Sequence, residues 1–374
     1  MLGCMPLKTD DHPQAPEGTL KTRQLWRIAG AGSLSRLRLV EEALSPPGPG
    51  EVQVAIHAVG VNFADIFACL GLYSATPQGS FVPGLEAAGV VVAVAADVSD
   101  WRPGDRVIVL TRFGGYASAL NVPAATLWPI PLGWSYAEAA AYPVQALTAW
   151  YGIEKLGNAR RDSVVLVQSA AGGVGIHAMR ALLRLGAKPV AVVGRSSKRH
   201  WLINEFGLPP ATVVLRDDRY AASLDAALQH WAARGFDLVF DAVYGKSFAP
   251  AYARLAAEGR YVLYGAADFM NTGARANPLK LLWGWLRRPR LDPLAMIPQN
   301  RGLLAFNLIW LWEQAERLPD AMRATLALIP ERPTIGACYA FDNALAAMQS
   351  LQSGNTTGKL VLTVTQPDEP QPDA

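Results

Sequence analysis

A glycine-rich turn between an apolar run and a helix-like run is the feature that most constrains the fold of this chain. The run 164–167 reads Val-Val-Leu-Val, the turn 170–175 reads Ala-Ala-Gly-Gly-Val-Gly, and a helix-like run follows from 176 to 185. This order predicts a buried strand that enters a helix through a backbone that a ligand can approach closely, because glycine lacks a Cβ. Unpaired N–H groups at a helix N-terminus bind phosphate, so the turn favours a dinucleotide site over a turn without a ligand.

The next apolar run, 189–193, ends where the ribose of such a dinucleotide would lie. The residues that follow are Gly194, Arg195, Ser196, Ser197 and Lys198. Sites for NAD usually carry Asp or Glu at this point, which binds the free 2′-hydroxyl. Basic residues and small hydroxyls suit a 2′-phosphate instead, so we predict NADPH as the cofactor, bound here by Gly194, Arg195, Ser196 and Lys198.

The length of 374 residues and the hydrophobic content of 51% predict two domains. Short β-branched runs alternate with turn clusters from 24 to 121, which indicates a mostly β domain. Strand-like and helix-like runs alternate from 143 to 267, which indicates a doubly wound parallel sheet. A helix-like and then a strand-like run between 339 and 364 is expected to return to the first domain. We therefore predict tails at 1–22 and 365–374, a mostly β domain at 23–142 plus 325–364, and a cofactor domain at 143–324.

The charge and the cysteines exclude several classes of protein. A net charge of +3 without long basic runs excludes a nucleic-acid-binding protein. The polar segment 1–20 lacks the apolar core of a secretory signal, and the three cysteines are scattered. These features predict a cytoplasmic protein.

Motifs distributed between Leu20 and Val364 resemble those of the medium-chain dehydrogenases and reductases. They are Gly60-Val-Asn62-Phe-Ala-Asp65 with Gly71-Leu-Tyr73, Pro83-Gly-Leu-Glu86-Ala-Ala-Gly89, Pro103-Gly-Asp-Arg-Val107, the glycine turn, and Gly358-Lys359. The resemblance is to the quinone oxidoreductase branch, and within it to the zinc-free vesicle amine transport group through Tyr264-Gly265-Ala266 and the runs 277–312 and 300–307. It implies an α/β fold with a GroES-like, mostly β catalytic domain and a doubly wound parallel-sheet (Rossmann) cofactor domain.

The same resemblance indicates that the site lacks a metal. Zinc enzymes of the superfamily carry Cys and His at the positions of Asn62 and Leu85, which leaves Glu86 as the one ligand-type residue there. A catalytic zinc needs three protein ligands and an open position. Three cysteines cannot form the four-cysteine structural zinc lobe, and the five histidines show no short ligand spacing. We predict no metal site.

Without a Lewis acid, the reaction that fits is hydride transfer to an acceptor already polarised by conjugation, a quinone or an α,β-unsaturated carbonyl. The resemblance implies that Asn62 and Tyr73 donate hydrogen bonds to the developing charge on oxygen, and that Asp65 orients them. Purely structural roles stay open for both donors: a turn cap for Asn62 and packing at a domain edge for Tyr73.

Further cofactor contacts follow from the resemblance. Thr148 would face the nicotinamide and Lys359 would reach the cofactor from the catalytic domain, with a helix-surface threonine and a solvated strand-edge lysine as the alternatives. Arg216 replaces a tyrosine that often flanks the adenosine phosphate, which favours NADPH, and Ser169 replaces a glycine just before the turn. The remaining implied contacts are Ala171, Gly172, Gly173, Val174, Tyr264 and Gly265.

The run 274–312 has the character of an insertion. It contains Trp283, Trp285, Trp310 and Trp312, and from 275 to 301 it has six basic residues against one acid. It forms either a cleft lid and dimer surface, or a surface at 279–312 that contacts a membrane or a lipid-like substrate. We expect the first, with the tryptophans packed on the cofactor domain, because four exposed tryptophans would form a large apolar patch. The second would make the chain a lipid-handling or membrane-associated protein that retains a reductase fold.

The apolar run 259–264 would be an adhesive sheet edge if it stayed unpaired. Similar reductases pair such edges across a two-fold axis, so we expect a homodimer.

Overall fold

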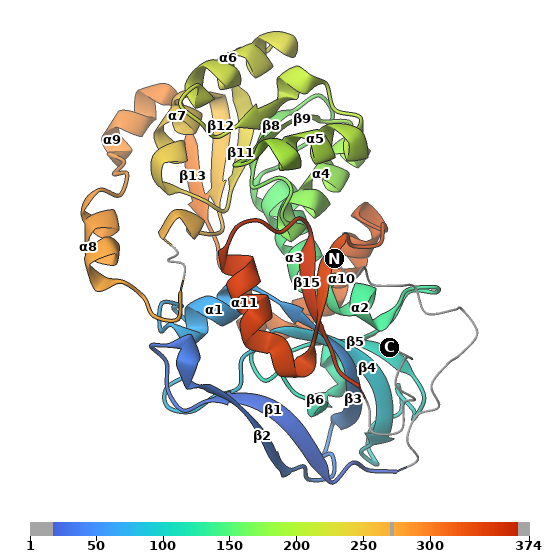
Figure 1. Ribbon diagram of the computed structural model, residues 1–374. Helices are drawn as coiled ribbons and strands as arrows, with labels where there is room; N and C mark the ends of the chain where they lie inside the picture. Colours follow the sequence, from blue (N-terminus) through green and yellow to red (C-terminus); the bar gives the residue numbers. More distant parts are fainter. Residues whose placement is uncertain (1–17, 270–272, 366–374) are drawn as a thin grey trace.

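The computed structural model describes residues 18–269 and 273–365, which form two lobes stacked one above the other (Figure 1). The predicted tails at 1–22 and 365–374 fall almost entirely outside the described residues. Each lobe is built around its own sheet and its own buried apolar cluster. The predicted α/β class with a mostly β lobe and a parallel-sheet lobe is confirmed, whereas the domain boundaries at 142 and 325 stay predictions.

The mostly β lobe is centred on two long, buried strands, β3 (Glu51–Val61) and β4 (Glu86–Val94). Their valines and alanines are covered on both faces, which explains why β3 is buried at ten successive positions. The sheet order is β14 (Ile335–Ala340), β15 (Lys359–Thr363), β3 (Glu51–Val61), β4 (Glu86–Val94), β5 (Arg106–Leu110) and β7 (Leu127–Pro129), with β6 (Ala119–Pro123) also pairing β3. A separate antiparallel ribbon is formed by β1 (Thr22–Ile28) and β2 (Leu37–Ala43). The helices of this lobe are α1 (Phe63–Cys69), α2 (Tyr136–Ala140) and α11 (Ala344–Gln352).

The chain returns to this lobe at its C-terminal end. Strand β15 is antiparallel to β3 and parallel to β14, so it joins segments far apart in the sequence. In Figure 1, β15 and α11 lie beside the β3 region, below the second lobe. This arrangement brings Lys359, the first residue of β15, to the C-terminal end of β3, where Leu360 pairs with Val61.

The second lobe has the strand order of a dinucleotide-binding sheet. Its strands are parallel in the order β10 (Val213–Leu215), β9 (Lys188–Val193), β8 (Val164–Gln168), β11 (Phe236–Asp241), β12 (Leu255–Leu263) and β13 (Gly302–Ala305). This is the 3-2-1-4-5-6 order of the Rossmann fold, whose ligands lie where the order reverses. The helices are α3 (Pro143–Trp150), α4 (Gly173–Leu185), α5 (Ser196–Phe206), α6 (Tyr220–His230), α7 (Phe248–Ala253) and α10 (Leu318–Leu328).

The structure corrects one expectation about this sheet. The run 259–264 was expected at the edge, but β12 lies between β11 and β13, with Tyr261 opposite Leu303. The short strand β13, whose sequence signal is only four residues long, forms the edge instead.

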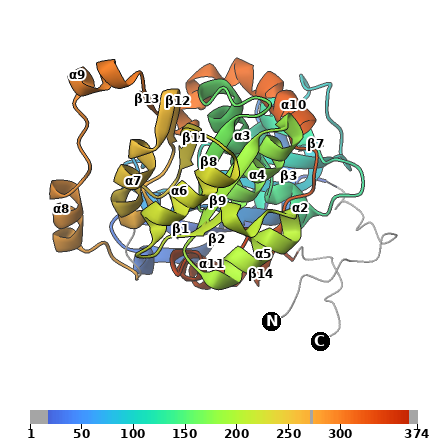
Figure 2. The same cartoon turned by 90° about the horizontal axis from the view of Figure 1, so that it is seen from above.

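The segment before β13 stands away from the body of the lobe. It contains α8 (Pro278–Leu286) and α9 (Pro293–Met296), which project to one side in both views (Figures 1 and 2). The expectation that the tryptophans of this segment pack on the cofactor domain is wrong for Trp283 and Trp285, which are 56% and 54% exposed because α8 buries none of its residues. Among the described residues, no helix is both long and apolar enough to cross a membrane.

Candidate active site

A cleft of about 890 Å³ lies between the two lobes, and both contribute to its walls. All the residues predicted to form the site line this cleft except Asp65, Ser196 and Lys359. The glycine turn, the residues after β9 and the Asn62 region therefore meet in one cavity, although they come from different lobes. This is the point where the strand order of the parallel sheet reverses, between β8 and β11.

The glycine turn forms the floor of the cleft at the start of α4. A Cβ added to Gly175 would lie 2.4 Å from the carbonyl oxygen of Ser169, and one added to Gly173 would lie 1.8 Å from Oε1 of Gln145. Ser169 itself adopts a φ of +54°, a left-handed conformation that a glycine would adopt without strain. The helix begins at Gly173, earlier than the predicted residue 176, so the glycines supply its first N–H groups. Side-chain-free backbone thus faces the cleft.

Three cations gather after β9 and β10, at the predicted 2′-phosphate site. The Lys198 ammonium donates to the carbonyl oxygen of Gly354 at 2.7 Å, and its pKa is lowered to about 8 by burial and then by the charges of Arg195 and Arg216. Among the described residues, the buried Nη1 of Arg216 has no hydrogen-bond partner. The repulsion among these three positive charges and the unpartnered Nη1 of Arg216 both favour the binding of an anion here.

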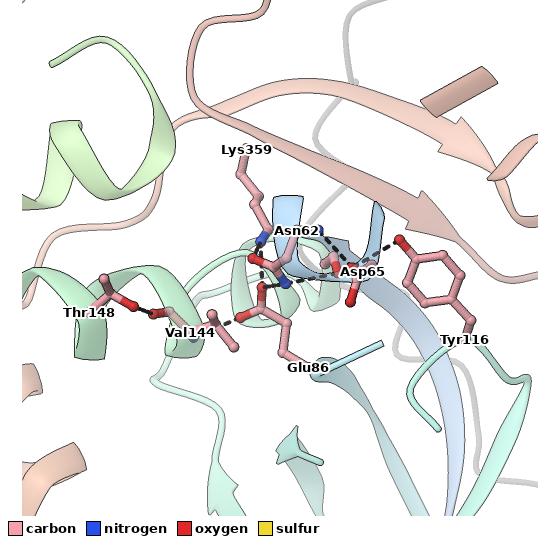
Figure 3. Close-up of polar contacts among 8 residues, drawn as sticks. Asn62, Asp65, Glu86, Tyr116, Val144, Thr148 and Lys359 are labelled. Atoms are coloured by element: carbon pink, nitrogen blue, oxygen red, sulfur yellow. Dashed lines mark hydrogen bonds and ion pairs between the residues drawn. The ribbon is translucent and has the colours of Figure 1, made fainter. Parts of the chain in front are cut away.

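A buried ion pair between Lys359 and Glu86 contacts Asn62 (Figure 3), and Asn62 lines the cleft. Lys359 donates to Oδ1 of Asn62 at 2.6 Å and forms a short contact with Oε1 of Glu86. Asn62 donates from Nδ2 to the same Glu86 oxygen at 2.8 Å. The other oxygen, Oε2, accepts the N–H of Val144 at 2.8 Å, in the first turn of α3, where a negative charge is stabilised. These contacts fix the orientation of the Asn62 amide.

The Lys359 contacts exclude one of the two interpretations of that residue. The side chain is 1% exposed, so the solvated strand-edge alternative is wrong. The ammonium does not line the cleft, and its partners are Asn62 and Glu86. Contact with the cofactor, which the resemblance implies, stays untested.

Asp65 is buried and does not line the cleft. Its Oδ2 accepts the backbone N–H of Asn62 at 2.8 Å, which caps the start of α1, and the Tyr116 hydroxyl at 3.1 Å. Burial raises the pKa of this carboxyl to about 7, against the opposing effect of the hydrogen bond from Asn62. The geometry agrees with the expected orienting role and with a structural cap.

Tyr73 contacts the opposite lobe. Its hydroxyl donates to Oδ1 of Asn307 at 2.8 Å, and burial raises its pKa to about 12. Asn307 follows β13 and precedes the 3-10 segment η8 (Leu308–Arg317). The Thr148 hydroxyl donates to the carbonyl oxygen of Val144 at 2.6 Å. Toward the cleft it can therefore act only as a hydrogen-bond acceptor.

Sequence reasoning missed three residues of this site. Glu86 was noted as a lone ligand-type residue but not as the partner of Lys359, although a carboxylate at the start of a buried apolar strand signals an ion pair. Gln145 lines the cleft with a buried Oε1 that has no partner among the described residues. Asn307 belongs to the run 300–307 that carries the resemblance, but its contact with Tyr73 was not predictable, because it spans 234 positions.

The family models match both lobes. The model of the alcohol dehydrogenase GroES-like domain matches residues 48–132, and the model of zinc-binding dehydrogenase matches residues 211–362. Within the described residues, no group of three or more His, Cys, Asp and Glu side chains is arranged to hold a metal ion.

Three known proteins illustrate the similarity. The human synaptic vesicle membrane protein VAT-1 homolog is 32% identical over 341 residues, which is 90% of this chain and 85% of the relative. The quinone oxidoreductase from Thermus thermophilus, solved also in complex with NADPH, is 29% identical with a TM-score of 0.71 and covers 91% of this chain and 99% of its own. A mycobacterial protein solved in complex with NADPH is 26% identical with a TM-score of 0.77 and has the same two coverages.

The motifs, the two-lobe fold and this similarity lead to one assignment: the chain belongs to the medium-chain dehydrogenase/reductase superfamily of oxidoreductases, as a member close to the VAT-1 homologues.

Proposed function

We propose that this protein is a zinc-independent, NADPH-dependent oxidoreductase that reduces quinones or α,β-unsaturated carbonyls. The observation that carries the proposal is one continuous cleft lined by the glycine turn, by the cations Arg195, Lys198 and Arg216, and by Asn62 and Tyr73. Two related structures contain NADPH, and one of them is a quinone oxidoreductase, which supports the same cofactor and acceptor class here.

The residues of the cleft suit a dinucleotide phosphate. A side chain at 173 or 175 would collide with Gln145 or with the carbonyl oxygen of Ser169, so these positions need glycine, and the first N–H groups of α4 would bind the pyrophosphate. The unpartnered Arg216 Nη1 and the two neighbouring cations would bind the 2′-phosphate. When bound, NADPH supplies the hydride.

The chain itself must stabilise the charge that develops on the acceptor oxygen. One N–H of Asn62 is bound to Glu86, while the nearest acceptor of its other N–H is the carbonyl oxygen of Gly60 at 3.4 Å, a weak contact. A substrate oxygen in the cleft would compete for this proton. Lys359 and Glu86 hold the amide in that orientation, so the donor is in place before the substrate arrives.

The buried Lys359–Glu86 pair also supports the proposal of metal independence. Asn62 and Leu85 stand where zinc enzymes of the superfamily have Cys and His, and Glu86 is already neutralised by an ammonium. A carboxylate paired in this way is a poor ligand for a dication, because metal binding would expel a buried lysine charge.

The proposal is tested by NADPH consumption with a panel of quinones and enones, on protein dialysed against a strong chelator. We expect turnover with at least one acceptor and no loss after dialysis. Asn62→Ala should lower kcat by about 10²-fold, as loss of one preorganised donor does, while the Kd for NADPH stays unchanged. NADPH binding without turnover of any acceptor, or zinc that is lost together with activity, would refute the proposal.

A further inference from the structure

The cleft wall contains a buried hydrogen-bond acceptor that the described residues leave without a donor. Gln145 lines the cleft and is 9% exposed, and none of the described residues donates to its Oε1. A buried amide oxygen without a donor raises the free energy of the folded state, so a reason for its presence is needed. A ligand that donates a hydrogen bond to this oxygen would remove that cost.

Gln145 lies between the two parts of the cleft that the proposed function uses. On one side, its Oε1 is packed against Gly173, the first residue of α4, where an added Cβ would lie 1.8 Å away. On the other side, the adjacent Val144 donates its N–H to Glu86, which also accepts a hydrogen bond from Asn62 (Figure 3). The side chain therefore stands between the proposed pyrophosphate site and the proposed acceptor site.

A second acceptor lies one turn further along α3. Residues 145 and 148 share a face of this helix, and both line the cleft. The Thr148 hydroxyl donates to the carbonyl oxygen of Val144, so this side chain also offers an acceptor to the cleft. A ligand that fits this wall has to supply hydrogen-bond donors.

Few groups of a nicotinamide dinucleotide can donate here. Phosphate oxygens are acceptors, so the pyrophosphate at the start of α4 cannot satisfy the Oε1 of Gln145. Each end of the pyrophosphate carries a ribose, and the ribose on the adenine side bears the 2′-phosphate, which would lie at Arg195, Lys198 and Arg216. The ribose on the nicotinamide side has free hydroxyl groups, and it joins the pyrophosphate to the ring that would face Asn62.

We propose that Gln145 accepts a hydrogen bond from a hydroxyl group of the nicotinamide ribose and so positions the nicotinamide ring in the cleft. This inference rests on the proposed function, because it needs a nicotinamide dinucleotide in the cleft. The carboxamide of the nicotinamide also has N–H donors, but it is further from the pyrophosphate than the ribose is. The contact of Gln145 with Gly173, in the glycine turn itself, favours the ribose.

The test uses three nucleotides that differ by one group at a time. 2′-Phosphoadenosine 5′-diphosphate ends at the pyrophosphate, 2′-phosphoadenosine 5′-diphosphoribose adds the second ribose, and NADPH adds the nicotinamide. Gln145→Met keeps the length of the side chain and removes the amide. We expect this change to raise the Kd of NADPH and of the diphosphoribose about three- to tenfold, the effect of one lost hydrogen bond, and to leave the Kd of the diphosphate unchanged. Isothermal titration calorimetry measures the three constants.

Two controls separate this contact from a structural role. Gln229→Met makes the same change at an exposed position of α6 outside the cleft, and it should alter none of the three constants. Without nucleotide, Gln145→Met should unfold at a temperature no lower than the unaltered protein does, because it removes an acceptor that the described residues leave unpaired.

The pattern of binding decides the outcome. A rise in Kd for NADPH alone would assign the contact to the nicotinamide, equal rises for all three nucleotides would indicate a structural role, and no rise would indicate no contact. Each of these results overturns the proposal while the proposed function stands. Failure of the unaltered protein to bind NADPH would refute the proposed function and this inference with it.

Discussion

At the scale of single residues, the site depends on one buried pair of opposite charges. Glu86 is fully buried and Lys359 is 1% exposed, so neither charge is solvated and each is stabilised by the other. Removing one partner leaves an uncompensated charge in the interior. The pair therefore couples the stability of the mostly β lobe to the orientation of Asn62.

A double-mutant cycle measures this coupling. Lys359→Met alone should lower the free energy of unfolding by about 3–5 kcal/mol, and so should Glu86→Gln alone. The double variant should be more stable than either single variant, because it buries no unpaired charge. Urea unfolding of the four proteins gives the coupling energy, and additive losses would show that the two charges do not stabilise each other.

The neighbouring Asp65 predicts how stability depends on pH. Its pKa of about 7 in the folded protein lies above the ordinary value of 3.8, so the fold favours the protonated carboxyl. Its contribution is complete below about pH 4 and is lost as pH rises through about 7. Asp65→Asn keeps an oxygen for Asn62 and Tyr116 and removes the charge. The unfolding midpoint of the unaltered protein should fall relative to this variant between about pH 5 and pH 8, and parallel curves would contradict the prediction.

At the scale of elements, we expect the first turn of α5 to determine the choice of cofactor. Arg195 and Lys198 line the cleft, whereas Arg199 on the same helix donates to the carbonyl oxygens of Val213 and Pro210. Charge-assisted hydrogen bonds contribute about 1.5–3 kcal/mol each, and about 1.4 kcal/mol is tenfold in affinity. We expect NADPH to bind at least tenfold more tightly than NADH.

Titration of both nucleotides tests this role of α5. Arg195→Ala with Lys198→Ala should remove most of the preference, while Arg199→Ala, the matched control, should retain it. Equal affinities for NADPH and NADH in the unaltered protein would show that this turn does not recognise the 2′-phosphate.

The elements with strong local patterns were predictable from the sequence. β8, β9 and α4 follow from a buried apolar run, a second run and a glycine turn, all within 30 residues. The short edge strand β13 was not predictable, because four residues give no periodic signal. Its pairing with β12 also joins residues 260–263 to residues 302–305, which lie about forty positions apart in the sequence. For the same reason the motifs identified Asn62 and Tyr73, but not the pairing of Lys359 with Glu86 or of Asn307 with Tyr73, which are contacts over more than 200 positions.

At the scale of the whole molecule, the exposed edge of β13 bears on assembly. Within the described residues, no strand pairs the outer edge of β13, which therefore offers backbone groups to a second copy beside the exposed Leu303. We expect a homodimer across this edge, although the run 259–264 is not part of it. Light scattering at micromolar concentration should give twice the chain mass, and Leu303→Glu should shift it toward the monomer. The matched control Leu132→Glu changes a fully exposed leucine between β7 and α2 and should stay dimeric. A monomer mass for the unaltered protein would refute the dimer.

The position of β15 in its sheet has a consequence for the order of folding during synthesis. Every strand of the parallel sheet is complete once Ala305 has left the ribosome, whereas the lobe that begins the chain still lacks β14 and β15. Until then, Glu86 has no lysine beside it and β3 lacks one of its neighbours. We therefore expect the later-synthesised lobe to fold first, while the earlier one waits on the nascent chain for its last strand and for the positive charge that this strand carries.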